Sequence, residues 1–242
     1  NSEVKNSENG ILSTNASVEI NNSNISFCSQ NGILVTDGEL EAANSFVDSC
    51  LQDGINSTNC KLTLTYNTIM ENIGCGVSIT GNQQTLIQEN TILANGNGIF
   101  LTGNETANVN INENKILANS QNGIQIDALA YSNNQIFNNT VSANSFGAYV
   151  STNATTNINR NSILDNIVGV FYDQGIDHVA YYNDIYGNIL GMNVSAQAIV
   201  NATYNFWGDR TGPNHELLNP TGRGNPVGGN GTNLDFLFFL TN

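Results

Sequence analysis

Two carboxylates, Asp127 and Asp173, stand at matching places in similar stretches of the chain, and Ser151 holds the same place between them. If matching places lie one strand spacing apart, two steps separate the carboxylates by about 10 Å. Such a pair could just fit general acid and base work of the inverting kind on a glycosidic bond. No Arg, Lys or His joins this series of positions. We therefore expect no catalytic residues and no enzyme, and keep glycan cleavage as the less favoured alternative.

Aromatic residues form a second series in the same stretches, two places after a recurring Gly. They are Phe100, Tyr149 and Phe171. Flat apolar rings on a surface can stack on sugar rings, because each ring offers a large apolar face. The alternative to a purely structural role is therefore a carbohydrate-binding module.

The elements that must position these residues come from an internal repeat of about 22 to 25 residues, which lies in the solenoid range. Its first Asn recurs at Asn44, Asn67, Asn90, Asn114, Asn139, Asn161, Asn183 and Asn205. Two places later comes a residue that we expect to point inward: Phe46, Ile69, Ile92, Ile116, Val141, Ile163, Ile185 and Trp207. A second Asn and then a Gly follow, after which residues alternate as in a strand.

These short strands cannot bury enough apolar surface as separate hairpins, so each copy must stack on the next. The sequence predicts an all-β, single-domain parallel β-helix of about nine coils, right-handed by the usual rule for parallel crossovers. We expect an irregular segment over residues 1–9, the β-helix over 10–208, and a cap or connector over 209–242. The two Asn series should form hydrogen-bonded ladders inside the bends.

An apolar stripe is expected on the outside of the rod, three places after the first Asn. Its members are Met70, Leu93, Leu117, Leu164 and Tyr186. An aligned stripe suggests packing against another molecule, with a covering loop as the alternative. A Thr series (Thr36, Thr58, Thr80 and Thr102) also faces outward. Strand propensity explains it better than ice binding does, because the partner column two places earlier holds Leu34, Asn56, Ser78 and Phe100 and so makes no paired Thr row.

All four cysteines lie in the first coils. Cys28 and Cys50 stand one period apart, each four residues before a Gly, so their Cα atoms should lie within disulfide range. We expect them to form an intrachain disulfide, with two stacked thiols as the alternative. Cys60 and Cys75 should not pair with each other, which leaves buried thiols or bridges to a neighbouring subunit.

The C-terminal end carries two features. Trp207 replaces the core Ile and should cover the last coil. The run Leu234, Phe236, Leu237, Phe238, Phe239 and Leu240 is apolar on both strand faces, and we expect it to dock on a neighbouring copy by strand addition, or else to fold back as a cap. Asp209, His215 and Glu216 are close only in sequence, so we expect no metal and no cofactor.

Composition limits the partners. The chain has 242 residues, a net charge of −14 and only six Lys plus Arg, which disfavours nucleic acid. No apolar run is long enough to span a bilayer. A chain rich in Asn and Thr that begins at Asn1 without Met reads as a processed, extracellular, cell-surface product. Glycosylation sequons, largely expected by chance, occur at Asn15, Asn21, Asn24, Asn56, Asn104, Asn138, Asn153, Asn193, Asn201 and Asn230.

Two resemblances extend this interpretation. The repeats across about Gly10 to Gly208 are similar to those of the carbohydrate-binding and sugar-hydrolase β-helix group. The ending Tyr204-Asn205-Phe206-Trp207-Gly208, followed by Gly212-Pro213, resembles the terminus of β-helix proteins of archaeal surface layers and methanogen sheaths, although Phe206 stands where Trp is usual. This resemblance implies a structural protein that assembles with copies of itself in a surface layer, sheath or filament. Cell-surface glycans are a further expected partner, and a polysaccharide lyase or hydrolase is the remaining alternative.

Overall fold

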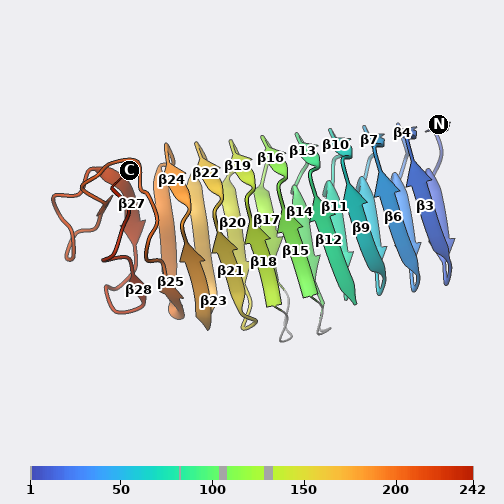
Figure 1. Ribbon diagram of the computed structural model, residues 1–242. Helices are drawn as coiled ribbons and strands as arrows, with labels where there is room; N and C mark the ends of the chain where they lie inside the picture. Colours follow the sequence, from blue (N-terminus) through green and yellow to red (C-terminus); the bar gives the residue numbers. More distant parts are fainter. Residues whose placement is uncertain (1, 82, 104–107, 128–132, 242) are drawn as a thin grey trace.

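The molecule is a rod of stacked coils, and each coil contributes three short parallel strands (Figure 1). The structure is a computed structural model, which describes residues 2–81, 83–103, 108–127 and 133–241. No helix occurs in these ranges, and hence none that could cross a membrane. The expected all-β solenoid of about nine coils is confirmed.

The third strand of each coil belongs to a sheet of nine parallel strands, which we call the short-strand sheet. Every strand in it has three residues. They are β1 (Glu3–Lys5), β4 (Asn24–Ser26), β7 (Phe46–Asp48), β10 (Thr68–Met70), β13 (Thr91–Leu93), β16 (Lys115–Leu117), β19 (Thr140–Ser142), β22 (Ser162–Leu164) and β24 (Asp184–Tyr186).

The first two strands of each coil build the remaining faces. The first strands are β2 (Ile11–Thr14), β5 (Ile33–Thr36), β8 (Ile55–Thr58), β11 (Val77–Thr80), β14 (Ile99–Thr102), β17 (Asn122–Ile126) and β20 (Phe146–Ser151). The second strands are β3 (Ser17–Asn21), β6 (Glu39–Ala43), β9 (Lys61–Thr65), β12 (Gln84–Gln88), β15 (Asn108–Asn112), β18 (Asn133–Phe137) and β21 (Thr156–Asn159). In the last coils β23 (Val168–Tyr181) and β25 (Leu190–Asn201) each span both faces.

The core is a set of aliphatic columns inside the rod. In the short-strand sheet the middle residue of each strand points inward, and the column from Ile69 to Ile185 is at most 2% exposed. Trp207 ends this column fully buried, as expected for a lid over the last coil. Glycines at the bend allow adjacent coils to approach closely, since a Cβ at Gly98 would lie 2.4 Å from the carbonyl oxygen of Gly123.

One part of the inward column was assigned wrongly. Phe46 is 53% exposed and pairs with Thr68, while Val47 is buried and pairs with Ile69. The reason is that Ser45, and not Asn44, occupies the ladder position: its backbone N–H donates to the side-chain oxygen of Asn67 at 3.0 Å. A shift of one residue in a strand sends a side chain to the opposite face.

The two asparagine ladders are confirmed. The first runs through Asn67, Asn90, Asn114, Asn139, Asn161, Asn183 and Asn205, and the second through Asn72, Asn95, Asn119, Asn144, Asn166 and Asn188. Cys28 and Cys50 stand at the start of the second ladder, where the N–H of Cys50 donates to the Asn72 side chain. Buried amides need such partners, so the ladders fix the stacking register.

The two ends of the rod differ. At the N-terminal end, residues 3–5 of the segment expected to be irregular form β1, which pairs with β4. At the C-terminal end, β27 (Gly224–Gly228) and β28 (Leu234–Asp235) pair with β25, and β26 (Pro213–Asn214) pairs with β27.

Candidate functional site

An aromatic cluster on the outer face of the first strands is the main concentration of sugar-compatible side chains. The rings of Phe146, Tyr149 and Phe171 lie with centroids 5.4 to 6.0 Å apart. Tyr149 and Phe171 were expected to lie together, whereas Phe146 was missed. Phe100 lies in the same column but two coils from Tyr149, because Gln125 pairs between them. We call Phe146, Tyr149 and Phe171 the aromatic cluster.

Two carboxylates flank the aromatic cluster at the C-terminal ends of these strands. Asp173 accepts a hydrogen bond from the Ser151 hydroxyl at 3.1 Å, and Asp127 accepts one from the Gln125 side chain at 2.7 Å. Asp173 does not occupy the place opposite Ser151, as the repeat suggested. A β-bulge pairs Ser151 with Gln174 instead, so Asp173 is the extra residue.

Two titratable groups of this surface, Asp127 and Tyr149, have a raised pKa. Burial raises the pKa of Asp127, the hydrogen bond from Gln125 opposes this shift, and the negative charge of Asp173 adds to it. Burial, and then the charge of Asp173, also raise the pKa of the Tyr149 hydroxyl. The nearest His in the sequence, His178, is buried and contacts Tyr172, so its ring faces the core and not this surface.

The chain can now be placed in a family. Residues 9–163 match the family model described as the right handed beta helix region. The chain belongs to this right-handed β-helix family. The match also supports the expected handedness, and the coils continue past it to Trp207. A search of curated proteins found no match.

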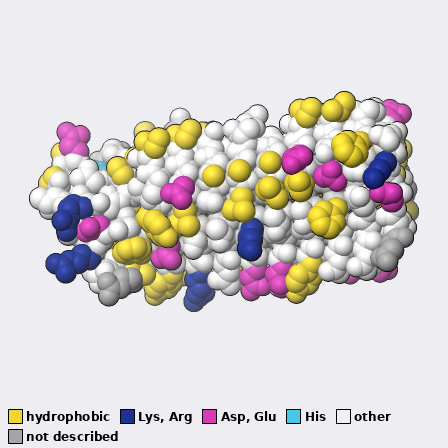
Figure 2. All heavy atoms as spheres, turned by 90° about the horizontal axis from the view of Figure 1, so that it is seen from above, with side chains coloured by type: hydrophobic (Ala, Val, Ile, Leu, Met, Phe, Trp, Pro, Cys, Tyr) yellow, Lys and Arg dark blue, Asp and Glu magenta, His cyan; other side chains and the backbone are white. Residues whose placement is uncertain are grey.

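The expected apolar stripe of this β-helix lies on the outside of the short-strand sheet. Met70 pairs with Leu93, Leu93 with Leu117, and Leu164 with Tyr186, and Ser142 interrupts the series once. Tyr186 is exposed, and the four aliphatic members are half-buried. Exposed aliphatic side chains also stand on the adjoining bend; these are Leu51, Ile73, Ile167 and Ile189. Figure 2 looks onto the short-strand side of the rod, where yellow hydrophobic side chains recur along its length.

The expected disulfide is absent, since all four cysteines are thiols. Each of the two thiols expected to pair donates a hydrogen bond to the carbonyl oxygen two residues earlier, Cys28 to Ser26 and Cys50 to Asp48. In-register side chains with the same orientation stay about one strand spacing, 4.8 Å, apart, whereas an S–S bond requires about 2.05 Å.

The two remaining cysteines differ from each other. Cys60 is fully buried, and its thiol donates to the Thr58 carbonyl, so the expected bridge to a neighbouring subunit is wrong there. Cys75 is half-buried, and its backbone N–H donates to the Asp53 carboxylate at 2.7 Å. Its sulfur accepts a hydrogen bond from the Asn97 carboxamide at 3.9 Å. An interchain bridge at Cys75 stays a prediction.

The C-terminal run does not form one apolar strand. Only β28 is extended, and it pairs with Val200 and Asn201 of the same chain. Leu234 and Phe236 are buried in the core, Phe239 and Leu240 are half-buried, and Leu237 and Phe238 are exposed. The expected docking on a neighbour is therefore wrong for the buried part, because Leu234 pairs with Val200 of the last coil and both Leu234 and Phe236 are buried in the core of the same chain.

His215 has a structural place in this cap. Its Nδ1 atom accepts the backbone N–H groups of Leu217 and Leu218 at 3.2 Å, and its ring lies 5.4 Å from that of Phe236. Asp209 instead accepts a hydrogen bond from Thr211, which lowers the pKa of Asp209. The described residues contain no group of three side chains arranged to hold a metal.

The sequons are distributed over the surface of the β-helix. Six of their asparagines are exposed: Asn15, Asn21, Asn138, Asn153, Asn201 and Asn230. Asn24, Asn56 and Asn193 are half-buried, and Asn104 lies outside the described residues. Glycosylation stays a prediction.

A column of stacked rings on the surface was also missed. Tyr182 and Tyr204 stack at 5.6 Å, Phe238 continues the stack at 6.3 Å, and the Arg160 guanidinium lies 6.0 Å from the Tyr182 ring. The signal was available, because residues 160, 182 and 204 are spaced by one period of 22. Their rings face one another along the rod, which gives them a packing role.

Proposed function

We propose that this β-helix is an extracellular structural protein of a cell surface, and that copies associate side by side through the short-strand sheet. The observation that carries the proposal is the in-register stripe of Met70, Leu93, Leu117, Leu164 and Tyr186. Aligned apolar side chains on a flat face favour lateral contact, because burying them removes apolar area from water. The protein acts in this role without catalysis.

A rigid rod suits such an assembly. The asparagine ladders connect successive coils through buried hydrogen bonds, and no linker interrupts the described strands between β1 and β25. The Asn- and Thr-rich, Lys-poor composition and the Trp207 ending support the surface location. The net charge of −14 opposes association of two copies in any orientation, so burial of the apolar stripe has to supply the favourable free energy.

Purified protein tests the proposal by negative-stain electron microscopy together with sedimentation velocity. The expected result is ordered lateral arrays or filaments whose fraction grows with protein concentration. Monodisperse single rods at every concentration would overturn it.

A second candidate function is polysaccharide binding at the aromatic cluster. It is favoured by the three clustered rings beside the Asp127 and Asp173 carboxylates. The rings match the apolar C–H face of a sugar, and the carboxylates can accept hydrogen bonds from its hydroxyl groups. The Tyr149→Ala plus Phe171→Ala variant should then lose affinity for an oligosaccharide that the wild-type protein retains. Cleavage of that oligosaccharide, lost in Asp127→Asn plus Asp173→Asn, would instead indicate an enzyme.

A further inference from the structure

The bend beside the apolar stripe is hollow in the middle of the rod and raised towards the C-terminal end. A depression of about 300 Å³ crosses the coils of β16, β19 and β22, and its lining includes Ala118, Ser120, Ala143, Ser145, Asp165 and Ile167. Two isoleucines raise the bend beside it, since Ile167 is 54% exposed and Ile189 is 76% exposed. We call these two isoleucines the aliphatic ridge.

The depression and the aliphatic ridge lie along one column of the bend. Ser120, Ser145, Ile167 and Ile189 each follow an asparagine of the second ladder by one place, so they stack on successive coils. Small side chains therefore occupy the coils of β16 and β19, and large apolar ones occupy the coils of β22 and β24. A surface with this relief matches a second copy of itself when the copy is turned end over end.

Charges follow the same division on the outer side of the short-strand sheet. Lys115 is the one basic residue in the described strands of this sheet from β7 to β24, and it lies in a coil of the depression. Asp184 occupies the same outward column three strands later, in a coil of the aliphatic ridge. Both side chains are exposed, and about 14 Å of sheet separates them, which is too far for an ion pair within the chain.

We infer that two copies of this chain pair face to face with antiparallel rods, so that the aliphatic ridge of each copy fills the depression of the other. The inference rests on the lateral association proposed above and specifies its orientation and register. A two-fold axis between β19 and β22 produces the pair, because β16 of one copy then faces β24 of the other, and β19 faces β22. Ile189 lies over Ser120, and Ile167 lies over Ser145. Each contact occurs twice.

The stripe and the charges agree with this register. Leu164 faces Ser142, the residue that interrupts the stripe, so a large side chain again opposes a small one. Leu117 faces Tyr186 and buries apolar area with it. Lys115 meets Asp184 of the second copy, and opposite charges across an interface fix its register. These two ion pairs also offset part of the repulsion between chains of net charge −14.

Parallel rods do not give this fit. Two faces that meet with their rods parallel reverse the order of the columns across the face, so the column of Lys115 and Asp184 opposes the bend and not itself. At equal heights the aliphatic ridge would then lie against the Asp184 carboxylate. Covering a charge without a cation beside it is unfavourable, which disfavours the parallel arrangement.

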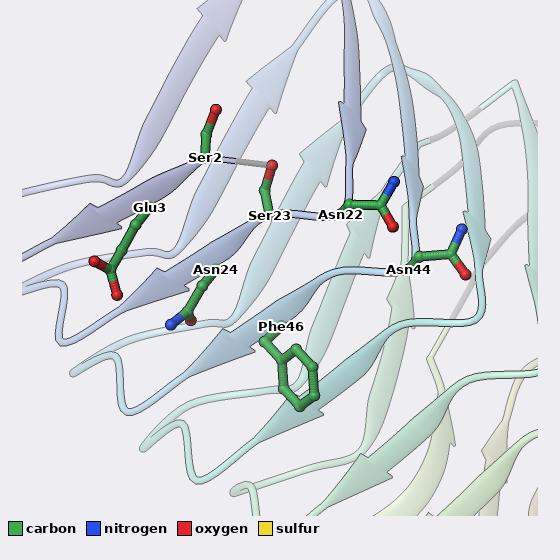
Figure 3. A pocket seen from close by; sticks show the side chains of 7 residues that line it. All are labelled: Ser2, Glu3, Asn22, Ser23, Asn24, Asn44 and Phe46. Carbon is green, nitrogen blue, oxygen red and sulfur yellow. The ribbon is translucent and has the colours of Figure 1, made fainter.

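A second antiparallel register would place Ile73 over Ser120. Ile73 is 69% exposed on the same bend, two coils before Ser120. The basic side chain of β16 would then face Thr68 of β10 and lose its acidic partner. Glu3, which lines a depression at the N-terminal end of the sheet (Figure 3), would face Asp184. Charge therefore favours the first register, which leaves the N-terminal coils outside the contact.

Exchange of the two charges tests the register by sedimentation equilibrium. Lys115→Glu and Asp184→Lys should each weaken self-association by at least about tenfold, because a pair of identical variants then has two like-charge contacts. An equal mixture of the two variants should regain wild-type association, since every mixed pair has two opposite-charge contacts. Lys61→Glu is the matched control: it makes the same change of net charge on another face and should weaken association less than about twofold.

Introduced thiols report the register directly. Ser120→Cys plus Ile189→Cys should give covalent dimers with a short bismaleimide reagent, because the two thiols meet across the pair. Ser120→Cys plus Ile73→Cys is the matched variant for the second register, with an isoleucine of similar exposure replaced, and should give no dimers. The wild-type protein treated in the same way measures any reaction of the native thiols.

The outcomes separate this inference from the proposed function. Unchanged far-ultraviolet circular dichroism would show that each variant is folded. Single wild-type rods at every concentration would overturn both the lateral association and the antiparallel pair. The antiparallel pair alone is overturned if wild-type rods associate but neither charge variant weakens them, if the mixture does not regain association, or if only the variant with Ile73→Cys forms dimers.

Discussion

The side-chain oxygen of Asn114 accepts two hydrogen bonds from Asn90 in the coil before it, one from the backbone N–H at 2.9 Å and one from the carboxamide at 3.1 Å. Asn114 in turn donates to Asn139 in the next coil through the same two groups. The same unit recurs along both ladders. Each rung therefore satisfies the backbone of one coil with the side chain of the next, so the loss of a single Asn leaves partners unpaired in two places.

Asn114→Ala should destabilise the protein by about 2 to 4 kcal/mol, because it leaves buried donors and acceptors without partners. Asn108→Ala is the matched control, since Asn108 is exposed at the start of the neighbouring strand β15, and it should change stability by less than about 0.5 kcal/mol. Urea denaturation followed by circular dichroism measures both. Equal effects of the two substitutions would contradict the assigned role of the ladder.

His178 should make the protein less stable as the pH falls. The ring is buried, donates from Nε2 to the Gln174 carbonyl at 2.8 Å, and leaves Nδ1 without a partner among the described residues. Burial lowers its pKa below the ordinary value of 6.5, so the folded state keeps it neutral while the unfolded chain takes up a proton. Its contribution is thus present above pH 6.5 and is lost as the pH falls through and below that value.

The measurement for His178 is the free energy of unfolding at several pH values between about 5 and 7.5, for the wild-type protein and for His178→Gln. The glutamine can still donate to Gln174 but does not titrate. The wild-type curve should fall more steeply on the acid side, by up to about 1.4 kcal/mol per pH unit. Parallel curves would show that His178 does not titrate with unfolding.

Leu93→Glu plus Leu164→Glu should abolish lateral association, because both substitutions place charge in the apolar stripe. Leu34→Glu plus Leu86→Glu adds the same charge at half-buried outward leucines of β5 and β12, on other faces of the rod. Sedimentation velocity should find single rods for the first variant and wild-type assemblies for the second. Assemblies that persist in the first variant would place the contact elsewhere.

The cysteines should react slowly with iodoacetamide at pH 8 until urea unfolds the protein. Burial raises the pKa of Cys50 to about 12, and burial together with the Asp53 charge raises that of Cys75 to about 12, so these two residues hold almost no thiolate. Cys28 and Cys60 are buried, so the reagent cannot reach them in the folded protein. Mass spectrometry of tryptic peptides without reduction counts the modified thiols. A linked Cys28 and Cys50 peptide would contradict the thiol state and restore the expected disulfide.

Phe236→Ala should destabilise the protein by about 3 to 5 kcal/mol, because the ring is fully buried in the C-terminal cap. Phe238→Ala, two residues later, removes a ring that is 65% exposed and should have little effect on unfolding. Thermal unfolding compares the two variants. Similar decreases in the unfolding temperature of the two variants would mean that the stability of the cap also depends on the surface stack of Tyr204 and Phe238.

The sequence alone determined the repeat, the parallel coils, the inward column from Ile69 to Trp207 and the asparagine ladders. These features depend on periodicity, because every coil repeats the same hydrogen-bonding and burial requirement at the same place. The outward placement of the stripe, Tyr149 and Phe171 followed from strand alternation for the same reason.

Tertiary structure decided the features that depend on local register. Phe46 points outward because Ser45, and not Asn44, occupies the ladder position. The repeat spacing counted from Asn44 therefore assigned Phe46 to the wrong face of its strand. Asp173 left its column because a bulge paired Ser151 with Gln174, and the cysteines stayed apart because in-register stacking holds their side chains parallel. The run after Leu234 folded back because the last coil has no successor, so its core must be covered by the chain that follows it.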